Sequence, residues 1–333
     1  MKMQVHQDPL PVARRADTLA VHSVERVVFT VPDIAPAEAF YTAFGLDVKR
    51  VGPRIDLYTH GHSHCWMTVV ANGQPKALQY VSFGIFAEDR PAFEAKIQAL
   101  GIGCGPYPMA TDDSGLWLHS PDGMPVQLLV CDKVSPSCKT PAHPVRMPAR
   151  QTAAAHARSQ CARVFPRWLS HVLLFTPNVA RMLGFCDEVL GLRLSDRSGD
   201  LVAFMHTPHG SDHHLLAFVK SGGPGLHHTS WDVGSLDEVG EGSEQMRTAG
   251  FTEGWGVGRH VLGSNYFYYA RDPWGSFAEY SFDIDFVPQT TDWTAGDYAP
   301  EDSFYLWGPV VPEWFVANTE LPTPSAVEAS QAG

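Results

Sequence analysis

Four segments of this chain begin in the same way, and this repetition limits the possible folds more than any other feature. Each opens with a short alternating run typical of a β-strand, continues into a helical stretch and ends in two or three strand-like runs. We therefore predict an α+β fold of four βαβββ units, paired into two tandem barrel modules. The units begin RVVFTVPDI at Arg26, YVSFGIFAED at Tyr80, HVLLFTPNV at His171 and HTSWDVGSLDE at His228.

Start and stop signals mark the helices of these units. In the fourth unit, Ser235 and Glu238 have the spacing of a capping box, in which each side chain satisfies an unpaired backbone donor of the first turn. Gly250 is placed to end that helix. Gly101 and Gly191 follow the apolar stripes of the second and third units in the same way, so we expect those helices to end there.

Changes in composition place the boundaries of the modules. Residues 132–165 are rich in Pro, Ser and Ala and show no sustained hydrophobic period, which is typical of a connection between domains. Residues after Phe286 are rich in Pro and Asp but keep large aromatic side chains, so we expect them to pack on the protein up to a loose tail from Leu321. The predicted parts are an N-terminal arm (1–20), an N-terminal module without a metal site (21–131), a linker (132–165), a catalytic C-terminal module (166–286) and an aromatic C-terminal segment with the tail (287–333).

Charge and hydrophobicity exclude several classes of protein. The chain of 333 residues is 44% hydrophobic and 18% charged, which predicts a large buried core. A formal net charge of −12 and the lack of a basic run argue against a nucleic-acid partner. No apolar stretch is long enough to span a bilayer, and the N-terminus lacks the apolar core of a signal peptide. We expect a cytoplasmic protein with no membrane partner, and the apolar sheet edges and aromatic tail favour a homo-oligomer.

Histidines are concentrated in the second half of the chain. Of 16 histidines, eight fall between His171 and His260. When the modules are aligned by their repeats, two of these histidines and one glutamate occupy positions where the first module has other residue types. The spacings are similar, 57 and 51 residues in the second module against 54 and 47 in the first. The aligned pairs are His171 with Arg26, His228 with Tyr80 and Glu279 with Gln127.

Two imidazoles and one carboxylate on one face of a barrel form a metal site that leaves coordination positions open. This arrangement is typical of non-haem Fe(II) that must bind both a substrate and dioxygen. The sequence therefore predicts His171, His228 and Glu279 as metal ligands. Because neighbours on a strand alternate between faces, His213 and His227 are predicted to point to the opposite face, with a structural role or a role in supporting the ligands from behind. Two further histidines of this region, His206 and His209, are expected at the surface.

One stretch near the end of the second module resembles a known signature. Residues 258–279, GRHVLGSNYFYYARDPWGSFAE, resemble the motif of type I extradiol ring-cleaving dioxygenases, members of the vicinal oxygen chelate superfamily. The motif departs at Tyr268, where the family usually has an aliphatic residue or Phe. A histidine before an apolar run ending in Ala-Phe, at His214, is a second shared feature, and the resemblance covers most of residues 21–290. The matching elements are Gly258, His260, Tyr269, the turn Asp272-Pro273-Trp274-Gly275, and Glu279.

The resemblance implies an activity and roles for these residues. Such enzymes bind a catechol to Fe(II), with Mn(II) as a possible replacement, and open the ring next to the diol with both atoms of O₂. By correspondence, His214 is the acid–base residue, and His260 and Tyr269 hydrogen-bond the substrate oxygen. The substrate class left open includes 2,3-dihydroxybiphenyl-like, alkyl and carboxylated catechols, the last through a contact with Arg259.

Three alternative functions come from related proteins. A glyoxalase-like isomerase would take metal ligands from both modules, and Arg26 and Tyr80 argue against that. A hydroxyphenylpyruvate-dioxygenase-like enzyme shares the two histidines and the glutamate, but the motif ending at Glu279 and the presence of His214 favour a catechol-cleaving enzyme. A non-enzymatic binding protein of the superfamily would need no such set of ligands.

Overall fold

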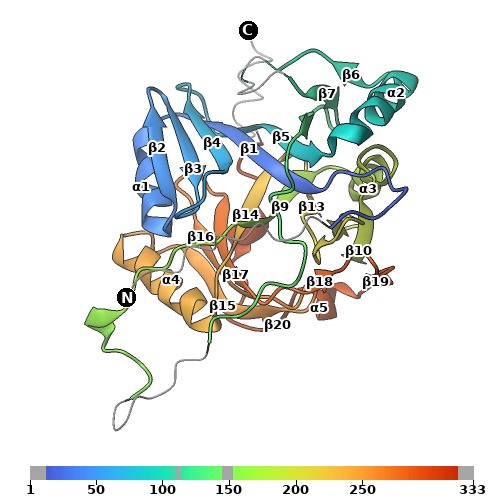
Figure 1. The fold of residues 1–333 in the computed structure, drawn as a ribbon. Helices are drawn as coiled ribbons and strands as arrows, with labels where there is room; N and C mark the ends of the chain where they lie inside the picture. Colours follow the sequence, from blue (N-terminus) through green and yellow to red (C-terminus); the bar gives the residue numbers. More distant parts are fainter. Residues whose placement is uncertain (1–12, 108, 110–113, 145–152, 322–333) are drawn as a thin grey trace.

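The computed structural model describes residues 13–107, 109, 114–144 and 153–321, and its strands form two large sheets (Figure 1). The first 12 residues of the predicted arm and residues 322–333 of the predicted tail lie outside the described residues. The fold is α+β, as the repeats predict. Every predicted unit begins on a strand, and these four strands are β1 (Ser23–Val31), β5 (Ala77–Ile85), β9 (Leu169–Thr176) and β14 (Gly225–Asp232).

The first sheet has the order β2-β3-β4-β1-β5-β8-β7-β6. In each of its two units the last strand returns to lie parallel to the first, so β1 pairs with β4 and β5 with β8. The two units join where β1 and β5 run antiparallel. The other elements are α1 (Ile34–Phe44), β2 (Asp47–Val51), β3 (Arg54–Tyr58), β4 (Cys65–Ala71), α2 (Arg90–Leu100), β6 (Gly103–Cys104), β7 (Leu116–His119) and β8 (Pro125–Val130).

The second sheet repeats this order and adds a strand at each edge. Its core order is β10-β11-β13-β9-β14-β17-β16-β15, with β9 and β14 antiparallel at the centre. Two short strands of the C-terminal segment lie outermost, β19 (Gly296–Asp297) beside β10 and β20 (Tyr305–Trp307) beside β15. The other elements are α3 (Val179–Phe185), β10 (Arg193–Ser198), β11 (Val202–His206), β13 (Leu216–Lys220), α4 (Leu236–Thr248), β15 (Gly254–His260), β16 (Tyr266–Arg271) and β17 (Phe277–Phe282), with α5 (Pro300–Ser303) before β20 and a separate pair formed by β12 (Ser211–Asp212) and β18 (Phe286–Val287).

The predicted helix ends are confirmed, with one addition. Ser235 Oγ accepts the Glu238 N–H at 3.2 Å at the start of α4, while the Glu238 carboxylate accepts the Gly234 N–H. Helix α3 continues into a turn of π-helix, Cys186–Leu190, before Gly191 ends it with φ of 72°. A Cβ at Gly191 would stand 2.2 Å from the Leu19 carbonyl oxygen, so only glycine allows the arm to pack against this helix end.

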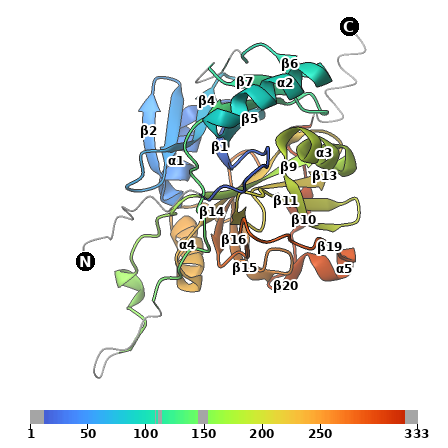
Figure 2. The same ribbon diagram turned by 45° about the vertical axis from the view of Figure 1, so that its right-hand side comes forward.

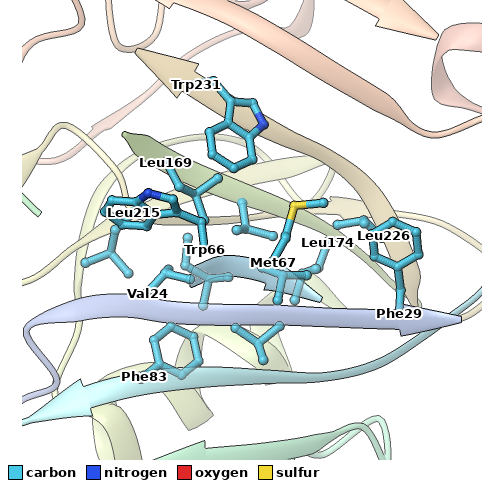
Figure 3. Close-up of a cluster of buried hydrophobic side chains, with 14 of the residues drawn as sticks. Val24, Phe29, Trp66, Met67, Phe83, Leu169, Leu174, Leu215, Leu226 and Trp231 are labelled. Atoms are coloured by element: carbon cyan, nitrogen blue, oxygen red, sulfur yellow. The ribbon is translucent and has the colours of Figure 1, made fainter. Parts of the chain in front are cut away.

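One hydrophobic cluster runs through both modules (Figure 3). Met67 of β4 packs in the same cluster as Leu174 of β9 and Leu226 of β14. Helix α1 lies against α4, and α2 lies against the π-helical turn after α3 (Figure 2). This shared core fixes the second sheet, which carries the candidate site, against the first. No helix in the described parts of the chain is both long and apolar enough to cross a membrane.

Candidate metal centre

The repeat-equivalent positions occupy matching places in the two sheets. In the second sheet, His171 of β9 stands opposite Ser230 of β14, and Ser230 stands opposite Glu279 of β17. His228 lies two residues before Ser230 on β14. In the first sheet, Arg26 stands opposite Ser82, and Ser82 stands opposite Gln127. The positions that the sequence repeats align are therefore structurally equivalent in the two sheets.

The structure brings His171, His228 and Glu279 together in the interior of the second sheet. One ligand atom from each lies within 4.8 Å of the others. The Nε2 atoms of His171 and His228 lie 3.2 and 3.5 Å from Glu279 Oε2. All three residues are buried, and Glu279 is fully inaccessible. All three come from one module, which is inconsistent with the ligand set of a glyoxalase-like isomerase shared between modules.

The chemistry of these three residues fits a divalent metal. His228 Nε2 and Glu279 Oε2 are buried without a hydrogen-bond partner among the described residues, and such orphaned atoms are costly unless a further group satisfies them. Burial lowers the pKa of His228 well below its ordinary value, which leaves the neutral imidazole that a metal requires. Burial alone would raise the pKa of Glu279, but His171 and His260 lower it below its usual range. Two neutral imidazoles and a carboxylate are the donors of non-haem iron or manganese sites.

Hydrogen bonds behind His228 fix which of its nitrogens faces the carboxylate. His227 Nε2–H donates to the Phe315 carbonyl oxygen at 2.8 Å, so His227 Nδ1 accepts the Nδ1–H of His228 at 2.7 Å. The lone pair of His228 therefore lies on Nε2. The prediction that His227 points to the opposite face is wrong, because a bulge in β14 between Leu226 and His228 breaks the strand alternation.

A second set of hydrogen bonds orients His171. The Ser170 hydroxyl donates to Asp212 Oδ2 at 2.6 Å, and its oxygen accepts the Nδ1–H of His171 at 3.3 Å. Nε2 of His171 is thereby left free to face Glu279. Asn265, which no sequence motif singled out, donates from Nδ2 to Glu279 Oε1 at 3.0 Å. No local pattern marks this residue, because it reaches Glu279 only when β16, which begins at the next residue, pairs with β17.

His260 and Tyr269 lie beside the carboxylate. His260 Nδ1–H donates to the Phe304 carbonyl oxygen at 2.9 Å, so its Nε2 accepts the Tyr269 hydroxyl at 2.9 Å. The same Nε2 lies 3.9 Å from Glu279 Oε1. Burial and the charge of Glu279 raise the pKa of Tyr269 well above its ordinary value, so the phenol stays protonated. Both of these predicted site residues therefore lie beside the candidate ligands Glu279 and His228.

His214 lies on the side of the site formed by His171, and their ring centroids are 4.0 Å apart. His214 lies just before β13, which begins two residues later at Leu216. Burial lowers the pKa of His214 well below its ordinary value, so its imidazole is neutral. Its predecessor His213 does not point away as predicted, because in this irregular stretch the Nδ1 atoms of the two rings lie 3.0 Å apart.

Two histidines expected at the surface are buried instead. His206 and His209 are 4% and 0% exposed. His206 Nδ1 lies 2.8 Å from Ser195 Oγ, and His209 Nδ1 accepts the Arg15 N–H at 3.1 Å. The N-terminal arm that carries Arg15 covers this connection, and a local sequence pattern cannot show such cover.

Aromatic residues of the C-terminal segment close the space next to His260 and Tyr269. Phe315 packs on Tyr269 at 4.9 Å between ring centroids, and Phe304 packs on Trp255 at 5.1 Å. Arg259 is directed elsewhere, because its guanidinium lies 4.7 Å from the Tyr266 ring centroid and its Nε donates to the Ser264 carbonyl. The wall beside the site is therefore apolar.

Known proteins resemble this chain in both sequence and fold. Residues 168–280 match the family model described as the glyoxalase/bleomycin resistance protein/dioxygenase superfamily. Metapyrocatechase 2 from Cupriavidus necator is 52% identical over 301 residues, which cover 90% of this chain and 93% of that protein.

Solved structures extend the likeness in fold to nearly the whole chain. A variant of homoprotocatechuate 2,3-dioxygenase from Brevibacterium fuscum has a TM-score of 0.69 at 21% identity, covering 95% of this chain and 86% of that one. The Mn(II)-bound glyoxalase from Novosphingobium aromaticivorans has a TM-score of 0.69 at 23% identity, covering 92% and 95%. The chain is a member of the type I extradiol ring-cleaving dioxygenases of the vicinal oxygen chelate superfamily.

Proposed function

We propose that this extradiol dioxygenase holds Fe(II) through His171, His228 and Glu279. Its substrate is a catechol without a charged ring substituent, and the ring opens next to the diol. The observation that carries the proposal is the pair of buried, orphaned atoms on His228 and Glu279, which lie beside the His171 imidazole. A bound divalent metal supplies the positive charge that lets the diol bind in ionised form and the redox chemistry that activates O₂. The same three donors also suit Mn(II).

Three further side chains handle the substrate and its proton. The neutral imidazole of His214 takes up the proton of a substrate hydroxyl and returns it when the O–O bond breaks, so both oxygen atoms end in the product. His260 Nε2 accepts the Tyr269 hydroxyl, whose oxygen in turn accepts a hydrogen bond from the second substrate hydroxyl, so the two residues together orient the ring. These roles are supported by the 2.9 Å bond between the two groups and by the position of His214 against His171.

The apolar wall favours catechol or an alkylcatechol over a carboxylated one. Trp255 and Phe315 pack on Tyr269, and Phe304 packs on Trp255 behind it. A substrate carboxylate would need a cation, and the guanidinium of Arg259 is held over the Tyr266 ring. Burying a carboxylate without a cation against this wall costs roughly several kcal/mol, because the charge loses its hydration and gains no partner.

The test begins with anaerobic purification and loading with Fe(II) or, in parallel, Mn(II). Catechol, 3-methylcatechol, 2,3-dihydroxybiphenyl and 3,4-dihydroxybenzoate are then added in air while yellow product and O₂ uptake are followed. We expect one O₂ consumed per catechol, both atoms of ¹⁸O₂ in the product, faster turnover with Fe(II), and little activity on the carboxylated compound. Absence of product and of O₂ uptake with every catechol and both metals would overturn the proposed function.

We also propose that the chain is a homo-oligomer. Leu306, Trp307 and Val310 lie on or next to the edge strand β20 and are 63%, 45% and 86% exposed. Exposed apolar residues on a sheet edge favour association with another copy. Light scattering after size-exclusion chromatography measures the mass directly, and a mass of one chain would rule out the oligomer.

A further inference from the structure

A chain of hydrogen bonds runs from His214 away from the metal ligands. His213 Nδ1 lies 3.0 Å from His214 Nδ1, and His213 Nε2 lies 2.8 Å from Asp196 Oδ2. The His213 side chain is fully buried and that of Asp196 is 8% exposed. The other carboxylate oxygen of Asp196 accepts the Gly296 N–H at 2.6 Å, at the point where β19 joins β10.

The donors and acceptors of this chain follow from the carboxylate. An ionised carboxylate only accepts hydrogen bonds, so His213 carries its proton on Nε2. With its ring proton on Nε2, His213 has a lone pair on Nδ1, which accepts the Nδ1–H of His214. His214 consequently presents the lone pair of Nε2, the nitrogen that can take a proton from substrate.

We propose that Asp196 and His213 are positioning residues that hold His214 in the tautomer able to accept the substrate proton. This inference rests on the acid–base role proposed for His214 above. Ring packing supports it, because His213 lies between Phe204 and Trp293, with centroid distances of 6.1 and 5.3 Å, and cannot easily turn.

His227 and His228 form a similar pair, in which the two Nδ1 atoms are hydrogen-bonded and His227 donates to a weaker acceptor behind it. There the outer acceptor is the Phe315 carbonyl, whereas behind His213 it is a carboxylate. A charged acceptor forms a hydrogen bond roughly twice as strong as a neutral one. The stronger hydrogen bond therefore supports His214, which must exchange a proton. The weaker one supports His228, which is proposed to remain a metal ligand.

Asp196→Asn tests the inference because it should reverse the direction of the hydrogen bonds between Asp196, His213 and His214. The Gly296 N–H keeps an oxygen on its side, so the new amide nitrogen would donate to His213 Nε2. His213 would then donate from Nδ1 to His214, and His214 would carry its proton on Nε2. We expect kcat to fall about 10–100-fold, as for other orienting partners, with metal content and the KM for catechol nearly unchanged.

A double-mutant comparison separates positioning from a structural role. In a His214→Phe background, Asp196→Asn should cause no further loss of kcat, because the residue it positions is gone. Equal fold-losses in both backgrounds would mean that Asp196 acts only on the fold and would overturn the inference, as would an unchanged kcat in the single variant. Asp297→Asn is the matched control, since Asp297 lies on β19, beside Gly296 and next to the strand of Asp196, and pairs with Arg197 instead. If Asp196→Asn does not fold, His213→Phe should give the same loss of kcat.

A spectroscopic measurement makes the test independent of turnover. Long-range ¹H–¹⁵N correlation spectra of the full chain loaded with diamagnetic Zn(II) distinguish the protonated from the bare imidazole nitrogen, and His214→Phe assigns the signal. We expect Nδ1–H at His214 in the wild type and Nε2–H in Asp196→Asn. The same tautomer in both would overturn the inference whatever the activity. Absent ring cleavage in the wild type, or full turnover of His214→Phe, would instead refute the proposed function or the role of His214.

Discussion

Lys76 Nζ and Glu320 Oε1 form an ion pair of 2.9 Å that joins the first module to the C-terminal segment. Both side chains are buried, with 3% and 8% of their surfaces exposed. Glu320 also accepts the backbone N–H groups of Leu78 and of Leu226, two residues before His228. The segment that carries the Phe304 and Phe315 carbonyls is thus tied to both sheets at its far end.

Glu320→Ala should destabilise the protein strongly, because it leaves the Lys76 ammonium buried without its carboxylate. We expect the free energy of unfolding to fall by about 3–5 kcal/mol, measured by urea denaturation. Glu313→Ala, at an exposed glutamate of the same segment, should change it by less than about 0.5 kcal/mol. Equal stability of the two variants would contradict this role of the ion pair.

Glu279→Gln should lose most of the bound metal, since the amide removes the negative charge that both histidines face. Metal analysis after gel filtration measures this directly, and His171→Ala and His228→Ala should behave alike. Gln127→Ala replaces the equivalent residue of the first module and should leave the metal content unchanged. A full equivalent of metal in Glu279→Gln would refute its assignment as a ligand.

His227→Phe should weaken metal binding although His227 is not a proposed ligand. The substitution removes the acceptor of the His228 Nδ1–H, so His228 is no longer held with its Nε2 lone pair toward the site. We expect metal affinity to fall about 10–100-fold in competition with a chelator. His64→Phe, which replaces a histidine of the first module that bonds the Glu25 carbonyl, is the control and should have no effect on affinity.

Stability should fall as the pH drops below about 6.5, the pKa of an unfolded histidine. Burial lowers the pKa of four histidines outside the metal centre in the folded state, so unfolding takes up protons between their folded and unfolded pKa values. Stability therefore rises with pH across this window and is lost on acidification, by up to about 1.4 kcal/mol per pH unit for each group. Urea unfolding between pH 4 and 8 measures the slope of the unfolding free energy against pH. His22→Phe should reduce this slope by the contribution of one proton, and an unchanged slope would contradict the lowered pKa of His22. The folded pKa values are about 3 for His22 and about 4 for His64, His206 and His209.

Regular parts of the fold could be predicted because their signals are local. Ser235 and Gly191 mark helix boundaries through the conformations of their own turns, and the structure confirms both. The repeat also allowed Glu279 to be aligned with Gln127, because the pairing of neighbouring strands is preserved when a whole unit is duplicated. The organisation into arm, modules, linker and tail stays a prediction.

Other features depend on contacts between segments far apart in the chain. His209 appeared exposed because its cover, the arm at Arg15, lies 194 residues earlier. A bulge in β14 overrode the alternation that predicted opposite faces for His227 and His228. The short strands β19 and β20 are too brief to show a period, and they form only because the sheet edges at β10 and β15 offer free hydrogen-bonding groups.

The order of synthesis gives the carbonyl groups of Phe304 and Phe315 a further consequence. When the ribosome completes β17, all three candidate ligands exist, but the acceptors for His260 and His227 have not yet been translated. A nascent chain at that stage lacks the two carbonyl groups that direct the ring protons of His260 and His227, and both edges of its second sheet are bare. The ring orientation of these two histidines is therefore completed only by residues that follow the three candidate ligands in the chain.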